Sequence, residues 1–172
     1  TTGFVADAVN GAVIKDLTLE GNVKADQRWC GILFGENYGA TAQNITIRAN
    51  LHSDYAGACY NGVLSGWDEK TCTYENIVIE STLSGTGTYM GGLIGDVAGT
   101  TYLKNVLVVT DANVDDKTQN SPLIAKPRSG ANFDNVYFVN KGGLELSIGG
   151  ATEITMDEVN NGAACFMLNK GN

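Results

Sequence analysis

A five-residue phrase bounded by glycine recurs along this chain and constrains its fold more than any other feature. It occupies residues 31–35 and 62–66, is shortened at 92–95 and is echoed at 122–125. Each copy is followed by an Asn or Asp anchor that precedes apolar residues. The anchors are Asp16, Asn44, Asn76, Asn105 and Asn135, which are 28, 32, 29 and 30 residues apart. Spacings of this size are typical of stacked repeats, in which each repeat buries its apolar face against its neighbours.

The residues around each anchor predict a strand with a bend in it. Positions one and three after the anchor are apolar in every copy, which predicts a strand with those positions facing inward. They are Leu17 and Leu19, Ile45 and Ile47, Ile77 and Ile79, Val106 and Val108, and Val136 and Phe138. The second position before the anchor is also apolar, so the alternation slips by one residue. A bend at the anchor would turn both sets inward, and Asn or Asp suits such a bend and can hydrogen-bond along a ladder.

The glycine phrase predicts a second short strand in each repeat. It ends nine or ten residues before each anchor, so the variation in repeat length lies between the anchor and the next glycine phrase. Two short strands and one variable stretch per repeat indicate a right-handed parallel β-helix of about five coils, roughly 24 Å long at about 4.8 Å per coil. A leucine-rich repeat is the alternative, but its period of about 20–29 residues is shorter and includes a helical segment that these repeats do not show.

Residues 143–172 depart from the repeat and form a predicted tail behind the β-helix of residues 1–142. Thr155 and Glu158 have the spacing of a capping box, which begins a helix. Apolar residues follow at helical spacing. They are Val159, Ala163, Phe166 and Met167.

The outward positions of the predicted strands give this tail a place to pack. The second and fourth positions after the anchor are polar in the first two coils and apolar in the last two, where they are Leu107, Val109, Tyr137 and Val139. A solvent-facing strand has no reason to gather four large apolar side chains, so we expect a cover. The tail is the nearest one, and we expect it to fold back over coils four and five or to cap their end.

The repeat resembles a known family. A Gly-[Ile/Val/Leu]-[Leu/Ile]-x-Gly phrase followed ten residues later by Asn-[Val/Ile] is similar to the GLUG-motif repeat, and residues 91–95 match best. The resemblance covers about residues 3–140, although the first and fifth coils lack the paired glycines. Such repeats occur in large bacterial cell-surface and secreted proteins, including regions attached to IgA-specific metallopeptidases and adhesin-like proteins. The resemblance implies an extracellular or cell-surface β-helix, and it carries no catalytic residues.

The tail resembles a segment that follows such repeats in surface proteins of gut Bacteroidetes, where more chain usually follows. The sequence also shows no signal peptide. We therefore expect either that a leader was removed or that the chain is an excised region of a longer protein.

Composition excludes several classes of partner. The net charge of -8 argues against nucleic acid and anionic membrane surfaces, because both need a basic face. No stretch approaches the roughly 20 apolar residues that span a bilayer, so we expect no membrane insertion. We also expect no cofactor.

Catalytic patterns are weak in this sequence. The three arginines, Arg28, Arg48 and Arg128, fall at unrelated positions in their coils, unlike the cleft arginines of β-helical lyases. His52 lacks a second histidine or a matched cysteine that would activate a nucleophile, and it is interpreted as a solvated loop residue. We therefore expect that the chain is not an enzyme.

One variable loop is crowded with carboxylates, from Asp111, Asp115 and Asp116. Oxygen ligands at this density suit Ca²⁺, but the spacing lacks the regular alternation of an EF-hand loop. We favour a solvated acidic loop over a metal site.

Three aromatic residues are the candidate ligand-binding anchors. Trp29, Tyr60 and Tyr89 lie two or three residues before successive glycine phrases, which places them above one another in a stack of coils. Such a column either binds sugar faces or partner side chains, or stacks on itself and stabilises the solenoid. Self-stacking is the favoured interpretation.

The four cysteines have no metal-binding spacing. Small buried thiols are one interpretation, and a disulfide formed in an oxidising compartment is the other. Cys59 and Cys72 flank one glycine phrase, so we expect this pair if a disulfide forms. Cys165 is expected to be reduced, on the apolar side of the tail helix.

These observations lead to two functional hypotheses. The first is a non-catalytic extracellular module of a larger bacterial surface protein, with an adhesion or spacer role. The alternative is a β-helix that binds or cleaves a polysaccharide. The expected partners are a glycan or a host or cell-surface protein, together with neighbouring domains of the same polypeptide.

Overall fold

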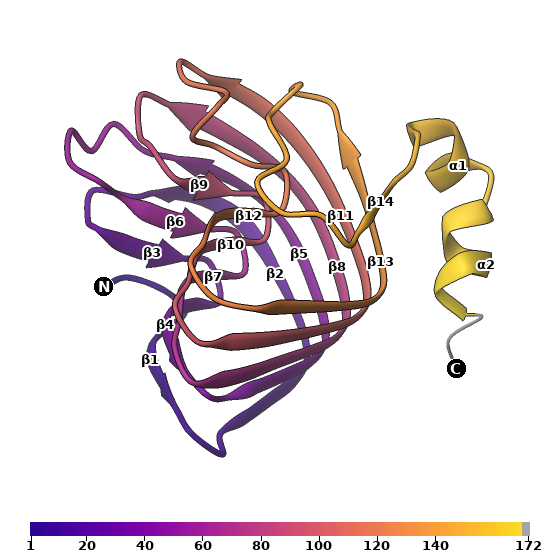
Figure 1. The fold of residues 1–172 in the computed structure, drawn as a ribbon, viewed down its shortest axis with the longest axis horizontal. Coiled ribbons are helices and arrows are strands. Elements are labelled where there is room, and N and C mark those ends of the chain that lie inside the picture. Colours follow the sequence, from indigo (N-terminus) through magenta and orange to yellow (C-terminus); the bar gives the residue numbers. More distant parts are fainter. Residues whose placement is uncertain (170–172) are drawn as a thin grey trace.

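The computed structural model describes residues 1–169, which form a parallel β-solenoid of about five coils followed by two short helices (Figure 1). The long sheet contains β2 (Val13–Lys24), β5 (Thr41–His52), β8 (Thr71–Gly85), β11 (Thr100–Val114), β13 (Ala131–Asn140) and the edge strand β14 (Thr152–Glu153). The middle sheet contains β1 (Val5–Val9), β4 (Phe34–Tyr38), β7 (Ser65–Asp68), β10 (Ile94–Val97) and β12 (Ile124–Pro127). The short sheet contains β3 (Trp29–Gly31), β6 (Tyr60–Gly62) and β9 (Met90–Gly91).

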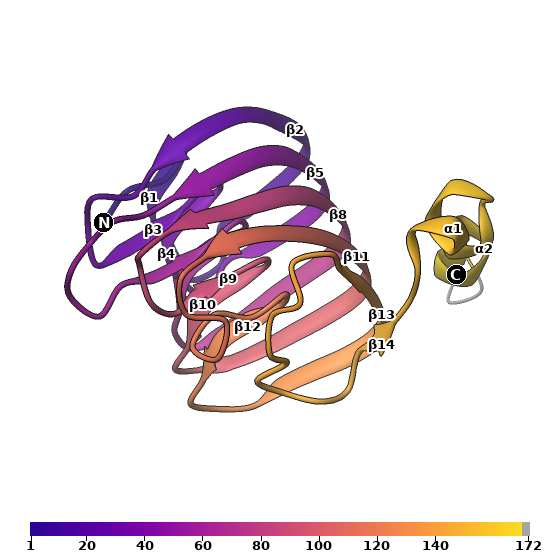
Figure 2. The ribbon, with the colours of Figure 1, turned by 90° about the horizontal axis from the view of Figure 1, so that it is seen from above.

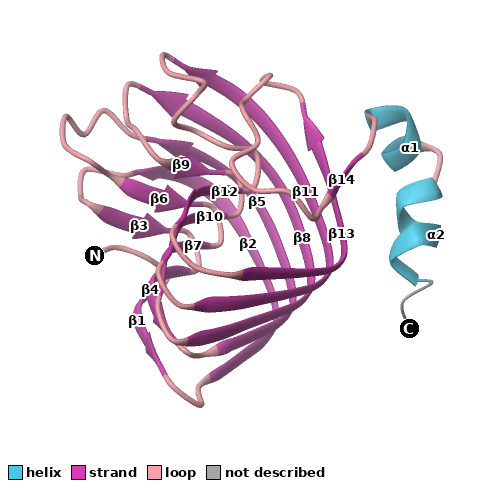
Figure 3. Ribbon diagram, in the orientation of Figure 1, coloured by secondary structure: helices cyan, strands magenta, loops and turns pink. Residues whose placement is uncertain are grey.

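Successive coils pair in parallel and in register, and Figure 2 shows them as a stack of slices from the first coil to the fifth. The predicted fold class is thereby confirmed. Figure 3 shows that helix occurs only in the tail, as α1 (Met156–Asn160) and α2 (Ala163–Asn169). Neither helix within residues 1–169 has the length and apolar character needed to cross a membrane. Residues 170–172 of the predicted tail lie outside the described residues.

The five long strands of this sheet, which are β2, β5, β8, β11 and β13, each bend at their anchor, as the slipped alternation predicts. All five anchors have left-handed backbone with φ between 55° and 59°, a conformation that Asn and Asp tolerate better than other non-glycine residues. From the second coil onward, each anchor amide donates to the anchor of the preceding coil. The Nδ2–Oδ1 distances are 2.7 Å for Asn44 to Asp16, 3.0 Å for Asn76 to Asn44, 3.1 Å for Asn105 to Asn76 and 2.8 Å for Asn135 to Asn105. The predicted ladder is therefore present.

The glycine phrase is a tight bend rather than the predicted strand. Its first glycine ends a strand of the short sheet, its last lies at or next to the start of a middle-sheet strand, and the residues between them turn the chain. A Cβ on Gly62 would lie 2.1 Å from the Ser65 carbonyl oxygen and 2.6 Å from the amide nitrogen of Gly95 in the next coil. Two backbones thus meet without side chains between them. The short sheet folds back onto the middle sheet with an offset of one coil.

The interior of the solenoid is mainly apolar, and one group of buried polar side chains lies at the corner between the middle and long sheets. Ile45, Ile47, Ile77 and Ile79 are buried in the interior, as predicted from the alternation. At the corner, the buried Asp68 carboxylate accepts hydrogen bonds from the hydroxyls of Tyr74, at 2.7 Å, and Thr101, at 2.9 Å. Buried polar groups are tolerated when they are hydrogen-bonded in this way.

The tail packs against the solenoid at two places. Leu144, Ile148 and Ala151 pack against the main core at the end of the stack, and β14 pairs with β13 at the sheet edge. The helices pack on the outer face of the long sheet, where Figures 1 and 2 show them beside β13. This second cluster contains Leu107, Val109, Tyr137, Val139, Ile154, Met156, Val159, Ala164, Met167 and Leu168.

Two details of the tail differ from the sequence prediction. The capping box of Thr155 and Glu158 is formed, but the helix is broken at Gly162, whose φ of 84° suits glycine. The break rotates the second helix, so Ala164 is buried whereas Phe166 is 64% exposed. Cys165 is likewise exposed rather than on the apolar side.

Candidate functional site

The predicted aromatic anchors lie close together, with Trp29 in β3, Tyr60 in β6 and Tyr89 directly before β9. Trp29 and Tyr60 are register partners, and the rings of Tyr60 and Tyr89 stack with centroids 5.3 Å apart and an interplanar angle of 20°. Trp29 instead stacks on Trp67 of the next coil, at 5.3 Å and 16°. The one-coil offset of the glycine bend explains this partner, because it brings the outer column of the short sheet against that of the middle sheet.

The facing column of the middle sheet carries charge. Glu36, Trp67, Asp96 and Lys126 occupy register positions in β4, β7, β10 and β12. Lys126 places its Nζ 4.4 Å from the centroid of the Tyr89 ring. Arg128, just beyond this column, places its Cζ 5.0 Å from the centroid of the Tyr60 ring. The rings are therefore packed against cations of their own chain, in the geometry of cation–π contacts.

A third cation reaches the same rings from the short sheet side. The Cζ of Arg28 lies 4.7 Å from the centroid of the Trp29 ring and 5.6 Å from that of Tyr60. Arg28 and Arg128 are exposed, whereas Tyr60 beneath them is 7% exposed. We call this surface the aromatic–cation face. Its members are Arg28, Trp29, Tyr60, Trp67, Tyr89, Lys126 and Arg128.

One carboxylate lies beneath these cations. The side chain of Asp96 is fully buried and forms an ion pair with Arg128. Burial raises the pKa of Asp96, although Arg128, Lys126 and Arg28 each act to lower it. The other oxygen of this carboxylate, Oδ1, has no hydrogen-bond partner among residues 1–169, and neither has Nε1 of Trp67. The face thus carries several charges, and two of its buried polar atoms lack a hydrogen-bond partner among the described residues.

The backbone of Tyr89 is strained. Its φ of 56° places a bulky side chain in the left-handed region, which residues of this kind rarely adopt. The conformation is held by the stacked Tyr60 ring and by a 3.2 Å hydrogen bond from the Asn61 amide to the Tyr89 carbonyl. The strain turns the Tyr89 ring onto the aromatic–cation face.

The sequence predicts three rings of this face, Trp29, Tyr60 and Tyr89, but neither Trp67 nor the cations. Arg28 and Arg128 lie at different positions in their coils and far apart in the chain, which predicts that they are unrelated. The structure corrects that interpretation, because both guanidinium groups contact the ring of Tyr60. The available signal was the Trp and Tyr column itself, which attracts cations to ring faces.

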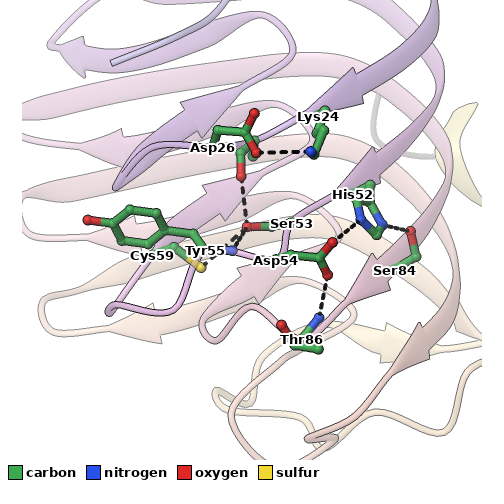
Figure 4. A network of polar contacts seen from close by, with 10 residues as sticks. Lys24, Asp26, His52, Ser53, Asp54, Tyr55, Cys59, Ser84 and Thr86 are labelled. Carbon is green, nitrogen blue, oxygen red and sulfur yellow. Dashed lines mark hydrogen bonds and ion pairs between the residues drawn. The ribbon is translucent and has the colours of Figure 1, made fainter.

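His52 belongs to a polar network at the end of β5 (Figure 4). Its Nδ1 lies 3.0 Å from the Ser84 hydroxyl, and its Nε2 lies 2.8 Å from Oδ2 of Asp54. The residue types are those of a serine hydrolase relay, but the two ring nitrogens are exchanged relative to that arrangement. The His52 and Asp54 side chains are 41% and 53% exposed, so water screens their interaction. This network ties the loop after β5 to the next coil.

The acidic loop is organised by its own hydrogen bonds. Oδ1 of Asp116 accepts from the amide of Thr118 at 2.8 Å and from its hydroxyl at 2.7 Å, and Gln119 contacts both carboxylate oxygens. Asp111 lies within β11 rather than in the predicted loop, and its carboxylate accepts from the amide of Ala112. Within residues 1–169, no group of three or more His, Cys, Asp or Glu side chains is arranged to hold a metal ion, so Asp111, Asp115 and Asp116 are not gathered into such a site.

The structure does not form the expected Cys59–Cys72 disulfide. Both residues are buried free thiols. The sulfur of Cys59 donates to the carbonyl of Thr88, whereas that of Cys72 bonds to the carbonyls of Asn37 and Glu69. Cys59 lies directly before β6, whereas Cys72 lies in β8, and the glycine bend and β7 come between them in the chain.

Comparisons with family models, with curated proteins and with solved structures return no match for this chain.

Proposed function

We propose that this chain is a non-catalytic extracellular module of a larger bacterial surface protein, where it serves adhesion or spaces neighbouring domains. The observation that carries the proposal is the ladder from Asp16 to Asn135, which joins all five coils. Each coil is tied to the next by side-chain as well as backbone hydrogen bonds. A stack of this kind is stiff and offers a long outer surface, which suits display and contact.

Localisation and attachment test this proposal. Antibodies against the chain should label intact cells of the source organism, and deletion of the chain from the parent protein should reduce attachment of those cells to their surface or host layer. Labelling that requires lysis would contradict the extracellular location. Unchanged attachment, with the parent protein still displayed, would leave the spacer role and exclude adhesion.

A polysaccharide-active β-helix is the second candidate. The aromatic–cation face favours it, because ring faces and cations are the groups that bind sugars with acidic substituents. Binding is proposed rather than cleavage. A reducing-sugar assay on the same polymers should show no new reducing ends, and their release would identify an enzyme.

A further inference from the structure

The aromatic–cation face is locally positive, whereas the molecule as a whole is negative. The chain carries a net charge of -8, yet two of its three arginines contact one tyrosine ring. Within residues 1–169, Arg28 and Lys126 have no ion-pair partner, and Arg128 is paired only with Asp96. Three cations thus gather around one buried carboxylate. Like charges held together in this way attract an anion.

The neighbouring carboxylates do not remove this excess. Glu36, which precedes Trp67 in the same column, is 6% exposed and accepts hydrogen bonds from Thr1 and Tyr38. Asp96 is buried beneath the cations. Both carboxylates therefore lie behind the surface, whereas Arg28 and Arg128 project from it.

The geometry points to an acidic polysaccharide as the ligand of this face, with a carboxylate or sulfate group seated between Arg28 and Arg128 over the Tyr60 ring. Guanidinium groups bind such anions through paired N–H donors, and stacking on an aromatic ring holds the guanidinium group in place. The three rings lie on successive coils, so an extended polymer laid along this face passes the partly exposed Trp29 and Tyr89 on either side of the buried Tyr60. Arg28 lies over the Trp29 ring and Lys126 over the Tyr89 ring, so the polymer meets a cation beside each of them.

Two further features lie on this face. Oδ1 of Asp96 and Nε1 of Trp67, an acceptor and a donor at neighbouring register positions, have no partner among residues 1–169. Buried polar groups without partners are rare in native structures. The left-handed Tyr89 backbone is the second feature, since strain of this kind gathers at functional sites.

This inference rests on the proposed adhesion role and names its ligand class. We would titrate the chain by calorimetry with polygalacturonate, dextran sulfate and neutral dextran. Binding of one or both acidic polymers, but not of dextran, is expected. Polygalacturonate and dextran sulfate distinguish a carboxylate ligand from a sulfate ligand. Binding should weaken between low and high salt, because exposed charges are screened.

Variants locate the binding on this face. Arg28→Gln and Lys126→Gln should each weaken binding by about tenfold, the effect of losing one charge-assisted hydrogen bond. Arg128 is left intact, because its loss would leave the buried Asp96 carboxylate without its ion-pair partner. Arg48→Gln is the matched control, since Arg48 is an exposed arginine that pairs with Glu20 on the long sheet. It should bind as the unmodified chain does, and circular dichroism should show all variants folded.

Three outcomes would overturn the inference. They are no binding of either acidic polymer, equal binding of neutral dextran, and equal weakening by Arg48→Gln and Arg28→Gln. Failure here is distinguishable from failure of the proposed function. One result would be that cells still attach through the parent protein although the purified chain binds none of the three polymers. That result would keep the adhesion role and assign it a ligand other than an acidic polysaccharide.

Discussion

The hydroxyl of Tyr74 donates a 2.7 Å hydrogen bond to the fully buried carboxylate of Asp68. Burial raises the pKa of Asp68 from 3.8 to about 6, against the lowering effect of hydrogen bonds from Ser65, Tyr74 and Thr101. The folded chain therefore binds this proton more tightly than the unfolded chain does. The resulting stabilisation is complete below pH 3.8 and is lost as the pH rises through 6.

Replacement of Asp68 by Asn should remove this pH dependence. Relative to Asp68→Asn, the free energy of unfolding of the unmodified chain should fall by about 3 kcal/mol between acid and neutral pH, since one pKa unit corresponds to about 1.4 kcal/mol. Urea unfolding followed by tryptophan fluorescence at several pH values measures this difference. Asp134→Asn, at an exposed position, is the control. Parallel pH profiles for the unmodified chain and Asp68→Asn would show that burial of Asp68 is not coupled to folding.

The central rung of the ladder should contribute to stability in two separable ways. Asn76 donates to Asn44, accepts from Asn105 and has a φ of 57°. Asn76→Gly loses the two side-chain hydrogen bonds, each worth about 1 kcal/mol, but keeps the backbone relaxed. Asn76→Ala should lose about 1 kcal/mol more, because left-handed backbone is costly for alanine. The denaturation midpoint should be highest for the unmodified chain, lower for Asn76→Gly and lowest for Asn76→Ala. Equal midpoints for Gly and Ala would argue against strain at the bend.

The glycine bend should not accept a side chain. Gly62→Ala places a Cβ 2.1 Å from the Ser65 carbonyl oxygen of the same bend and 2.6 Å from the Gly95 amide nitrogen of the next coil, so the bend must open and the coils must separate. We expect a loss of roughly 3 kcal/mol or more in stability, or a failure to fold, as for other overpacked sites. Gly130→Ala is the matched control, because its Cβ would meet no atom within 4 Å. Similar melting temperatures for the two variants would contradict the backbone contact between coils.

The tail should be held by burial of a small residue. Ala164 is 1% exposed within the cluster that covers Leu107 and Val139, whereas its neighbour Cys165 is exposed. Ala164→Glu should release the helices, lower the melting temperature and increase binding of a dye that recognises apolar surface, because a buried charge is costly. Cys165→Glu should change neither property. A chain that ends at Gly142 should resemble Ala164→Glu, and an unchanged melting temperature of this monomeric chain would show that the tail is not the cover.

The thiols should differ sharply in reactivity. Burial raises the pKa of Cys30 to about 11 and also raises that of Cys59 and Cys72, whereas Cys165 is exposed. A thiol reagent at pH 7.5 should therefore modify Cys165 rapidly and the other three only after denaturation, since the thiolate is the reactive form. Mass mapping of non-reduced peptides is the check. A Cys59–Cys72 cross-link in it would contradict the free thiols of the structure.

Features that repeat once per coil could be predicted from the sequence, because their cause is local. The alternation around Asn44 and Asn76 specifies which side chains face inward, and Asn at a fixed position specifies a left-handed bend and a ladder. The apolar outward residues Leu107 and Val139 likewise predict a cover, because burial of apolar surface is favourable wherever the covering segment lies in the chain. For the same reason the tail could be assigned to that patch without its exact helix geometry.

The way in which columns from different sheets meet could not be predicted from the sequence. The sequence predicts that Gly62 begins a strand, whereas it ends β6 and begins the bend, because its contact with Gly95 lies in another coil and leaves no trace in the periodicity of one repeat. That contact sets the one-coil offset, which places Trp29 on Trp67 and brings Arg28 and Arg128 to one ring. The pattern of each repeat fixes which way its side chains point. The distance between side chains of different repeats depends on how closely the backbones approach, and that is determined by packing across the whole stack.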